Sequence, residues 1–217
     1  MKKQYQSNFW IAAGIIAAFV LWTIAVCVVD VRAIGPGGSV VGFAQINRFV
    51  HELTGVHMTL YVITDWLGLV PIGVAFGFAV LGLKQWISRR SLLKVDRSIL
   101  ALGGFYLAVM AAYGIFEQLV VNYRPVLING YLEPSYPSST TMLVMCVMPA
   151  AAMQLNMRIK NAAIRRCAVF VIAGFTVFMV IGRLISGVHW VTDIIGGALL
   201  SAGLVMMYRA VVARELV

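Results

Sequence analysis

Four side chains have the types needed to hold and attack a phosphate group: Arg124, Arg183, His189 and Asp193. A guanidinium grips phosphate oxygens through paired, charge-assisted hydrogen bonds. An imidazole that a carboxylate holds at one ring nitrogen keeps the other nitrogen free as a nucleophile. His189 and Asp193 are four residues apart, a spacing that puts both on one face if the segment is helical. The four residues therefore predict phosphate chemistry centred on His189.

A run of hydroxyl side chains, Ser138, Ser139 and Thr140, follows Pro137 and opens an apolar segment. Hydroxyls and free backbone N–H groups in front of a helix point at a bound anion. Each of these features has an ordinary structural explanation when it stands alone, such as a helix cap or an arginine at the lipid interface. Together with two arginines and a His–Asp pair, the run predicts a phosphate-binding site.

Six apolar segments must position these residues, and they cover approximately 9–29, 58–83, 99–121, 140–157, 168–188 and 191–213. Of the 217 residues, 61% are hydrophobic and 12% are charged, whereas soluble domains are roughly half apolar and a quarter charged. A helix needs about 20 apolar residues to cross a bilayer. The sequence predicts an all-α bundle of six transmembrane helices that forms a single integral membrane domain, residues 1–217, with no separate soluble domain.

The basic residues fall mainly on one side of this predicted bundle. All but four of the 17 lysines and arginines lie near the termini or in the alternate loops after the second and fourth helices; the exceptions are Arg32, Arg48, Arg124 and Arg183. The positive-inside rule then predicts a multi-pass plasma membrane protein with both termini in the cytoplasm and the candidate site on the outer face. The same distribution explains the net charge of +9 without a nucleic acid partner.

Two outer loops connect the helices near the candidate site. In the first, residues 30–57, apolar residues at helical spacing (Phe43, Ile46, Val50 and Leu53) alternate with a polar face, which predicts a short helix at the membrane interface. The second, residues 122–139, contains Pro125, Pro134 and Pro137, which exclude a regular helix there.

The segment Gly182–Asp193 resembles the third signature of the type 2 phosphatidic acid phosphatase (PAP2) superfamily, which reads Ser-Arg, five residues, His, three residues, Asp. Arg124-Pro125 resembles the end of the first signature, Lys, six residues, Arg-Pro. Pro137–Thr140 resembles the second signature, Pro-Ser-Gly-His. The order of the motifs, their loop positions and the number of helices are also similar to those of the family.

This resemblance implies a role for each matching residue. His189 would attack phosphorus and form a phosphohistidine, Asp193 would orient it, and Arg124 and Arg183 would clamp the phosphate, with Ser138, Ser139 and Thr140 as further phosphate ligands. The family works without a metal or other cofactor, and the candidate site has no carboxylate cluster that would imply one.

Three positions depart from the family pattern: Glu117 stands in place of the first-signature Lys, Thr140 in place of the second-signature His, and Gly182 in place of the third-signature Ser. The missing histidine is the family's general acid, and a threonine hydroxyl does not ionise near neutral pH. Glu117 is seven residues before Arg124, a spacing that would put both on one face of the third helix. It is expected mainly to pair with Arg124 or Arg183, with Asp65 of the second helix as a competitor, unless Glu117 is protonated and supplies the proton.

The remaining proton donors on the outer side are His51 and His57, which would act only if the first outer loop folds over the site. The general acid is therefore left unassigned. A substrate whose leaving group needs no proton is affected least by this loss, which favours a diphosphate over a monophosphate ester.

Two hypotheses follow for the function. The first is a lipid phosphatase or phosphotransferase, with an isoprenoid diphosphate such as undecaprenyl diphosphate as the favoured substrate, and phosphatidylglycerol phosphate or phosphatidic acid next. The second is a weakened or inactive protein that binds or carries a lipid phosphate on the same scaffold. The expected partners are the lipid substrate and membrane lipids; the acceptor, water or lipid, and the oligomeric state are left open.

Overall fold

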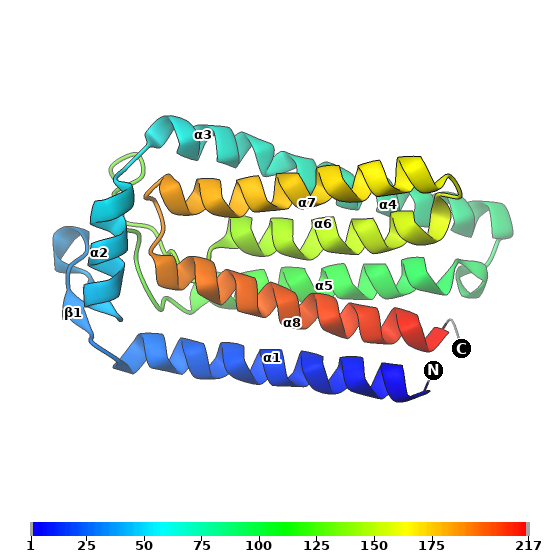
Figure 1. The fold of residues 1–217 in the computed structure, drawn as a ribbon, viewed down its shortest axis with the longest axis horizontal. Helices are drawn as coiled ribbons and strands as arrows, with labels where there is room; N and C mark the ends of the chain where they lie inside the picture. The colour runs from blue at the N-terminus through cyan, green and yellow to red at the C-terminus, as the bar shows by residue number, and fades with distance from the viewer. Residues whose placement is uncertain (1, 216–217) are drawn as a thin grey trace.

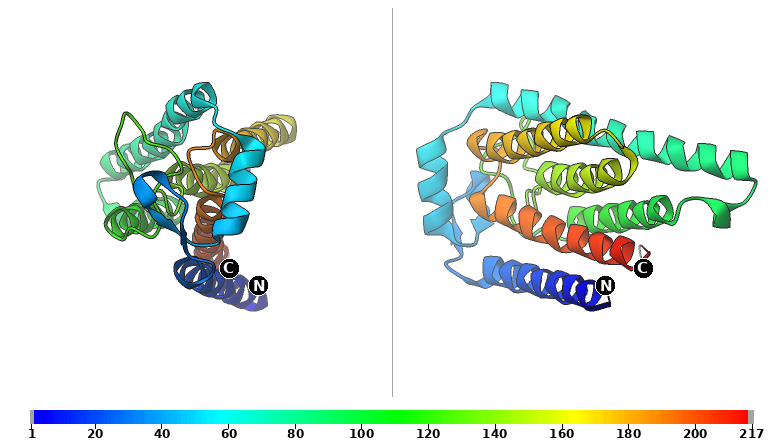
Figure 2. Two further views of the ribbon diagram at one scale, coloured as in Figure 1. Left: turned by 90° about the vertical axis from the view of Figure 1, so that its left-hand side faces the viewer. Right: turned by 45° about the vertical axis from the view of Figure 1, so that its right-hand side comes forward.

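The computed structural model describes residues 2–215 as a bundle of long helices (Figure 1). Six segments are long and apolar enough to cross a membrane, as the sequence predicts. Five of them are single helices: α1 (Lys2–Val28), α5 (Arg97–Gln118), α6 (Ser139–Arg158), α7 (Ala162–Ile185) and α8 (Val191–Glu215). The described chain begins and finishes at one end of the bundle, and α2 (Ala44–Thr54) lies across the other end (Figures 1 and 2).

The remaining span consists of two helices, α3 (Met58–Leu67) and α4 (Leu69–Arg89), separated at Gly68. Pro71 has no N–H to donate to the carbonyl of Leu67, which weakens the helix at this point. At the break, the Gly68 N–H is shared between the carbonyls of Thr64 and Asp65, at 3.1 and 3.0 Å. The break lets α3 pack against α7 while α4 packs against α6.

The centre of the bundle is formed by α6 and α8, which are half buried, whereas the other spans bury much less of their surface. The largest buried cluster joins α1, α5, α6 and α8 and includes Phe19, Leu102, Met142 and Tyr208. Large apolar side chains elsewhere, such as Phe76, Leu107 and Phe170, are exposed on the outside of the bundle. In a membrane protein this is the surface that meets lipid.

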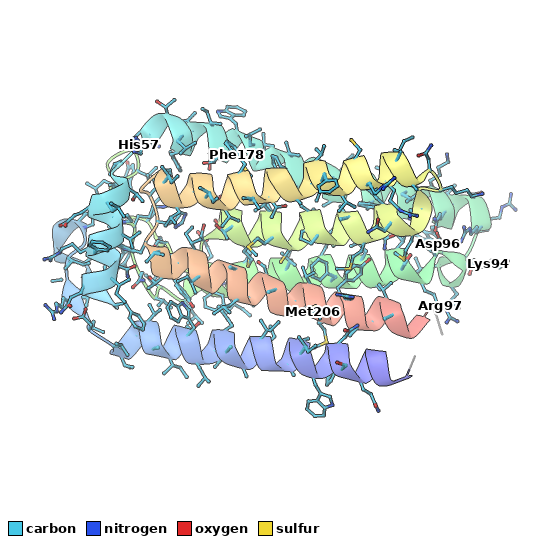
Figure 3. All side chains as sticks on the ribbon, viewed as in Figure 1. His57, Lys94, Asp96, Arg97, Phe178 and Met206 are labelled. Atoms are coloured by element: carbon cyan, nitrogen blue, oxygen red, sulfur yellow. The ribbon has the colours of Figure 1, made fainter. Side chains whose placement is uncertain are left out.

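A polar cluster around Asp96 closes the end of the bundle that carries the termini (Figure 3). Asp96 accepts hydrogen bonds from Arg89 at 2.9 Å, Arg158 at 3.1 Å and Gln85 at 2.8 Å, and so links α4, the start of α5 and the end of α6. Burial raises the pKa of this carboxyl, but the three hydrogen bonds outweigh burial and hold the pKa below its ordinary value.

The opposite end, here called the α2 end, carries a short hairpin of β1 (Arg32–Ala33) and β2 (Val40–Val41), with the turn η1 (Pro36–Gly38) between them, followed by α2. The helix confirms the one predicted in the first outer loop. Its apolar side chains Ile46, Phe49 and Leu53 are exposed, as expected for an interfacial helix. Asn47 belongs to the polar face of this helix, which was expected to be exposed. It is instead fully buried, because its amide group bonds to Thr192 at the start of α8.

Several predicted helix boundaries were wrong by three to seven residues; the first helix begins at Lys2 rather than 9, and the second span ends at Arg89 rather than 83. The fifth helix begins at Ala162 rather than 168, because the Asn161 side chain caps it by accepting from the N–H groups of Ala163 and Ile164. The third ends at Gln118 rather than 121. After η2 (Leu92–Lys94), α5 begins at Arg97, close to the predicted position.

Candidate active site

His189 and Asp193 are held at the start of α8, at the α2 end of the bundle. Asp193 is the third residue of the helix, and its Oδ2 accepts from the backbone N–H of Trp190 at 3.0 Å, which satisfies an N–H in front of the helix. His189 lies two residues before the helix begins. The prediction that both residues share one helical face was therefore wrong; the cap geometry brings them together, with Nδ1 of His189 3.7 Å from Oδ2 of Asp193.

Asn122 fixes the other oxygen of this carboxylate. Its Nδ2 donates to Oδ1 of Asp193 at 3.1 Å, and both residues are almost completely buried. The backbone of Asp193 is also held, because its carbonyl accepts from the N–H of Ser138 at 3.1 Å. Asn122 was not among the predicted site residues. Its signal was weak: a single amide two residues before Arg124, at the end of an apolar segment.

The geometry also indicates which nitrogen of His189 carries the proton. Arg124 Nη1 lies 3.2 Å from Nε2 of His189, and a guanidinium can only donate. Nε2 is therefore the unprotonated acceptor, with its lone pair directed at Arg124, and Nδ1 carries the hydrogen on the side of Asp193. The pKa of His189 is lowered to about 4: burial is the largest cause, Asp193 opposes it by raising the pKa, and the charges of Arg124 and Arg183 add to the lowering. At neutral pH the imidazole is neutral, the form that a nucleophile needs.

Arg124 is positioned by an antiparallel pairing within the second outer loop. Its N–H donates to the carbonyl of Glu133 at 3.0 Å, and the N–H of Ser135 donates to the carbonyl of Asn122 at 2.9 Å. The loop turns at Asn129-Gly130, both with positive φ, the pattern of a two-residue hairpin turn. Residues opposite each other in such a pairing project to the same side. The Glu133 carboxylate accordingly lies 3.0 Å from Nε of Arg124.

A polar cavity of about 320 Å³ opens in front of His189. Its charged lining residues are Arg124, Glu117 and Glu133, and the remaining lining residues are Tyr113, Phe116, Pro134, Ser135, Tyr136, Pro137, Ser139 and Met142. An apolar groove of about 410 Å³ adjoins it, since Tyr113, Ser139 and Met142 line both. The site thus combines a polar chamber with a hydrocarbon-lined extension.

The predicted hydroxyl ligands are distributed over three places. Ser138 is the residue before α6, fully buried, and its Oγ has no hydrogen-bond partner among the described residues. Ser139 begins α6 and lines the polar cavity, whereas Thr140 lines the adjoining groove. Only Ser138 therefore precedes the helix, although all three were expected to.

Arg183 lies outside the lining of the cavity and is engaged by α3. It is 2% exposed, and its two terminal nitrogens lie 3.3 Å from the Thr64 hydroxyl and the Asp65 carboxylate, with the guanidinium over the ring of Tyr61. Its Nε is buried and without a partner among the described residues. Gly182 permits this arrangement, because a Cβ there would stand 2.9 Å from the Thr64 methyl group.

Glu117 lines the cavity, but its position relative to Arg124 differs from the expected one. Because α5 ends at Gln118, Glu117 and Arg124 do not share a helical face. The carboxylates that pair with the two arginines are Glu133, on Arg124, and Asp65, on Arg183, rather than Glu117.

The His51 side chain supports the loop that carries His189, whereas the His57 side chain bonds within its own segment; both lie outside the cavity lining. His51 Nε2 is 3.1 Å from the carbonyl of Gly187, and His57 Nε2 is 2.9 Å from the carbonyl of Thr54. Gly187 has a φ of 70°, and a Cβ there would meet the Gly55 carbonyl at 2.1 Å, so this close contact requires glycine. Neither histidine is placed to donate a proton into the cavity.

Comparison with known proteins agrees with this arrangement. The model of the PAP2 superfamily matches residues 99–216, a stretch that includes every residue of the candidate site from Glu117 to Asp193. The crystal structure of the first transmembrane PAP2 type phosphatidylglycerolphosphate phosphatase from Bacillus subtilis superposes with a TM-score of 0.57 over 95% of this chain and 96% of that one, at 18% identity. A search of curated proteins gave no match. Since the family model covers more than half of its length, the chain belongs to the PAP2 superfamily, as a membrane-embedded phosphoric ester hydrolase.

Proposed function

We propose that the protein removes the terminal phosphate of a lipid diphosphate, through a phosphohistidine on His189, at the outer face of the plasma membrane. Membership of the PAP2 superfamily supports the broader assignment of a lipid phosphatase. The observation that carries the finer proposal is the neutral His189, whose unprotonated Nε2 contacts Arg124 in a polar cavity that adjoins an apolar groove.

The shape of the site favours a lipid. The polar cavity has room for a diphosphate headgroup, and the groove offers apolar side chains from three helices: Leu69 and Ile72 of α4, Val109 and Met110 of α5, and Leu143 of α6. A hydrocarbon tail in the groove would hold the phosphate in front of His189 without leaving the bilayer. Binding energy from the tail then serves to orient the reacting group.

In the proposed reaction, Nε2 of His189 attacks the terminal phosphorus, and the bond to the bridging oxygen breaks. The leaving lipid monophosphate takes the electron pair. Asp193 stabilises the positive charge that develops on the imidazole, and Arg124 stabilises the charge on the equatorial oxygens. Water then attacks the phosphohistidine, the P–N bond breaks, and inorganic phosphate is released.

The residues around the leaving group favour a diphosphate. Thr140 occupies the position of the family's general acid, and it lines the apolar groove. Loss of a general acid typically costs about 10²–10⁴ in rate. An alkoxide leaves poorly without a proton, whereas a phosphate leaves readily, so an isoprenoid diphosphate is the favoured substrate. Phosphatidylglycerol phosphate, the kind of substrate named for the similar structure, and phosphatidic acid are monoesters and come next.

The proposed orientation rests on the distribution of charge. The end of the bundle that carries the termini also carries Arg89, Arg90 and Lys94, and Arg158 reaches it through Asp96. The positive-inside rule puts this end in the cytoplasm and the cavity, at the α2 end, on the outer side.

A second candidate, a lipid-phosphate binder or carrier, is favoured by one observation. Arg183 lies outside the cavity lining, and its terminal nitrogens are engaged by Thr64 and Asp65, so it does not reach a phosphate in the cavity without rearrangement. A site in which Arg124 is the one arginine that contacts the phosphate would bind a phosphate lipid and turn it over slowly.

The decisive experiment measures phosphate release by the purified protein in lipid nanodiscs. A prenyl diphosphate, phosphatidylglycerol phosphate and phosphatidic acid are compared for the wild type, His189→Gln and His57→Gln. His57 is a matched control, because it is an exposed imidazole at the same end. We expect turnover of the prenyl diphosphate by the wild type and His57→Gln, and none by His189→Gln. Saturable binding without turnover would favour the binder instead.

A further inference from the structure

The polar cavity contains a carboxylate in contact with the arginine that faces His189. Glu133 lies 3.0 Å from Nε of Arg124, and the Nη1 atom of the same guanidinium lies 3.2 Å from Nε2 of His189. The guanidinium therefore stands between the nucleophile and the carboxylate. A phosphoryl group bound to Arg124 would have His189 on one side and Glu133 on the other.

We propose that Glu133 is the general base of the second half-reaction, in which water hydrolyses the phosphohistidine; this inference rests on the function proposed above. The carboxylate accepts a proton from the attacking water as the water oxygen bonds to phosphorus and the P–N bond to His189 breaks. The products are inorganic phosphate, a neutral His189 and a protonated Glu133, which returns its proton to solvent.

The position and exposure of Glu133 suit a base that acts on water. Its contact with Arg124 holds the carboxylate beside the guanidinium that would bind the phosphoryl group. The Glu133 side chain is 41% exposed, whereas that of His189 is 1% exposed, so Glu133 is accessible to water and His189 is not. This role is compatible with a diphosphate substrate, for which the first step needs no acid.

Glu133 is also held firmly enough for this role. The Arg124 N–H donates to the Glu133 carbonyl at 3.0 Å, and the neighbouring pair of Tyr123 and Pro134 forms a bridge. The side chain therefore projects from a fixed backbone into the cavity. Glu117 lines the same cavity but interacts with Tyr113, on the side shared with the apolar groove, so it is the less suitable base.

The test separates the two half-reactions. Farnesyl diphosphate labelled with ³²P in its terminal phosphate is mixed with wild type or Glu133→Gln, and samples are quenched on the millisecond-to-second scale. We expect Glu133→Gln to release about one farnesyl monophosphate per protein in a burst and then to turn over about 10²–10⁴-fold more slowly than wild type. The label should accumulate on the protein, and the double variant His189→Gln/Glu133→Gln should carry none.

A role of Glu133 limited to holding Arg124 predicts a different pattern. Both half-reactions, or substrate affinity alone, would then change in Glu133→Gln, and the phosphorylated protein would not accumulate; that result overturns the proposal. Glu117→Gln is the comparison within the same cavity, and accumulation of label there but not in Glu133→Gln would assign the base to Glu117. Formate should restore dephosphorylation to Glu133→Ala by supplying a small carboxylate, and failure of this rescue also counts against the proposal.

Failure of the underlying function is distinguishable from failure of this inference. If wild-type protein neither turns over the diphosphate nor becomes labelled, the proposed function is wrong and so is the inference. If wild type turns over through His189 but Glu133→Gln shows no excess of phosphorylated protein, only the role of Glu133 is wrong.

Discussion

Nη1 of Arg124 lies 3.2 Å from Nε2 of His189, so a permanent hydrogen-bond donor contacts the nitrogen that would attack phosphorus. This contact has two consequences. It fixes the neutral tautomer in which Nδ1 carries the hydrogen toward Asp193, and it keeps a phosphate-binding charge next to the nucleophile. A bound phosphate would take the guanidinium from the imidazole and leave Nε2 free to react.

The protonation state of His189 is testable by NMR, because the chain has only three histidines. We expect ¹⁵N and ¹³C spectra of the protein in micelles to show His189 as the Nδ1–H tautomer with a pKa near 4, and His51→Gln and His57→Gln variants to assign the signals. Arg124→Gln should raise this pKa, because it removes a nearby positive charge. A His189 that is protonated at pH 6.5 would contradict the tautomer and the neutral nucleophile.

The same lowered pKa links His189 to stability. Between pH 4 and 6.5 the unfolded chain binds a proton at His189 that the folded protein excludes. This group therefore makes the free energy of unfolding rise with pH across that window and level off above it. His189→Gln should flatten this part of the stability profile, measured by thermal unfolding at a series of pH values; an unchanged slope would argue against the low pKa.

Asn122 should act as a positioning residue through Asp193. Asn122→Ala removes the donor that lies 3.1 Å from Oδ1 of Asp193, and we expect kcat to fall about 10–100-fold with little change in KM, the range seen when a supporting hydrogen bond is lost. Asn122→Gln tests rescue by a longer amide. A melting temperature measured for each variant separates this effect from misfolding, and a rise in KM without loss of kcat would point to a different role.

The dependence of the hydrolysis rate on the leaving group follows from the positions of Ser139 and Thr140. Wild type should prefer a prenyl diphosphate over a prenyl monophosphate by at least about 10² in kcat/KM, because the monoester needs a general acid. Ser139 lines the polar cavity and Thr140 the groove, so Ser139→His should raise monoester hydrolysis more than Thr140→His does. Equal rates on both substrates for wild type would remove the argument for a diphosphate.

Membrane orientation is accessible to cysteine labelling once the native Cys27, Cys146 and Cys167 are replaced. Tyr131, 74% exposed beside the hairpin turn, marks the α2 end, and Leu93, 90% exposed in η2, marks the opposite end. We expect Tyr131→Cys to react with an impermeant reagent added outside cells, and Leu93→Cys to react only in inverted vesicles. The reverse pattern would place the candidate site in the cytoplasm.

The sequence predicted the six spans well, because hydropathy over about 20 residues does not depend on tertiary contacts. The pairing of His189 with Asp193 was predicted from helical spacing, yet it arises from a helix cap that the spacing alone does not specify. Asn129-Gly130 is a hairpin signal that is recognisable in the sequence. This signal does not by itself place Glu133 opposite Arg124. Three residues, 125–127, lie opposite the single residue Leu132 and shift the register of the pairing.

Long-range contacts account for the other features of the site that the sequence did not predict. Asn47 and Asn122 reach the site from separate segments, and only the folded bundle shows that each binds a motif residue or its neighbour. Asp65, by contrast, was expected to compete for an arginine, and it contacts Arg183. The position of Thr140 on the groove side of α6 depends on how α4 and α5 pack beside it.

The most direct test of the account is whether phosphate becomes attached to His189. Wild-type protein in nanodiscs is mixed with farnesyl diphosphate labelled in its terminal phosphate, quenched in alkali, digested and analysed by mass spectrometry. We predict an alkali-stable, acid-labile phosphate on the peptide that contains His189, with no label in His189→Gln. Turnover without this label, or a label on another residue, would contradict the account.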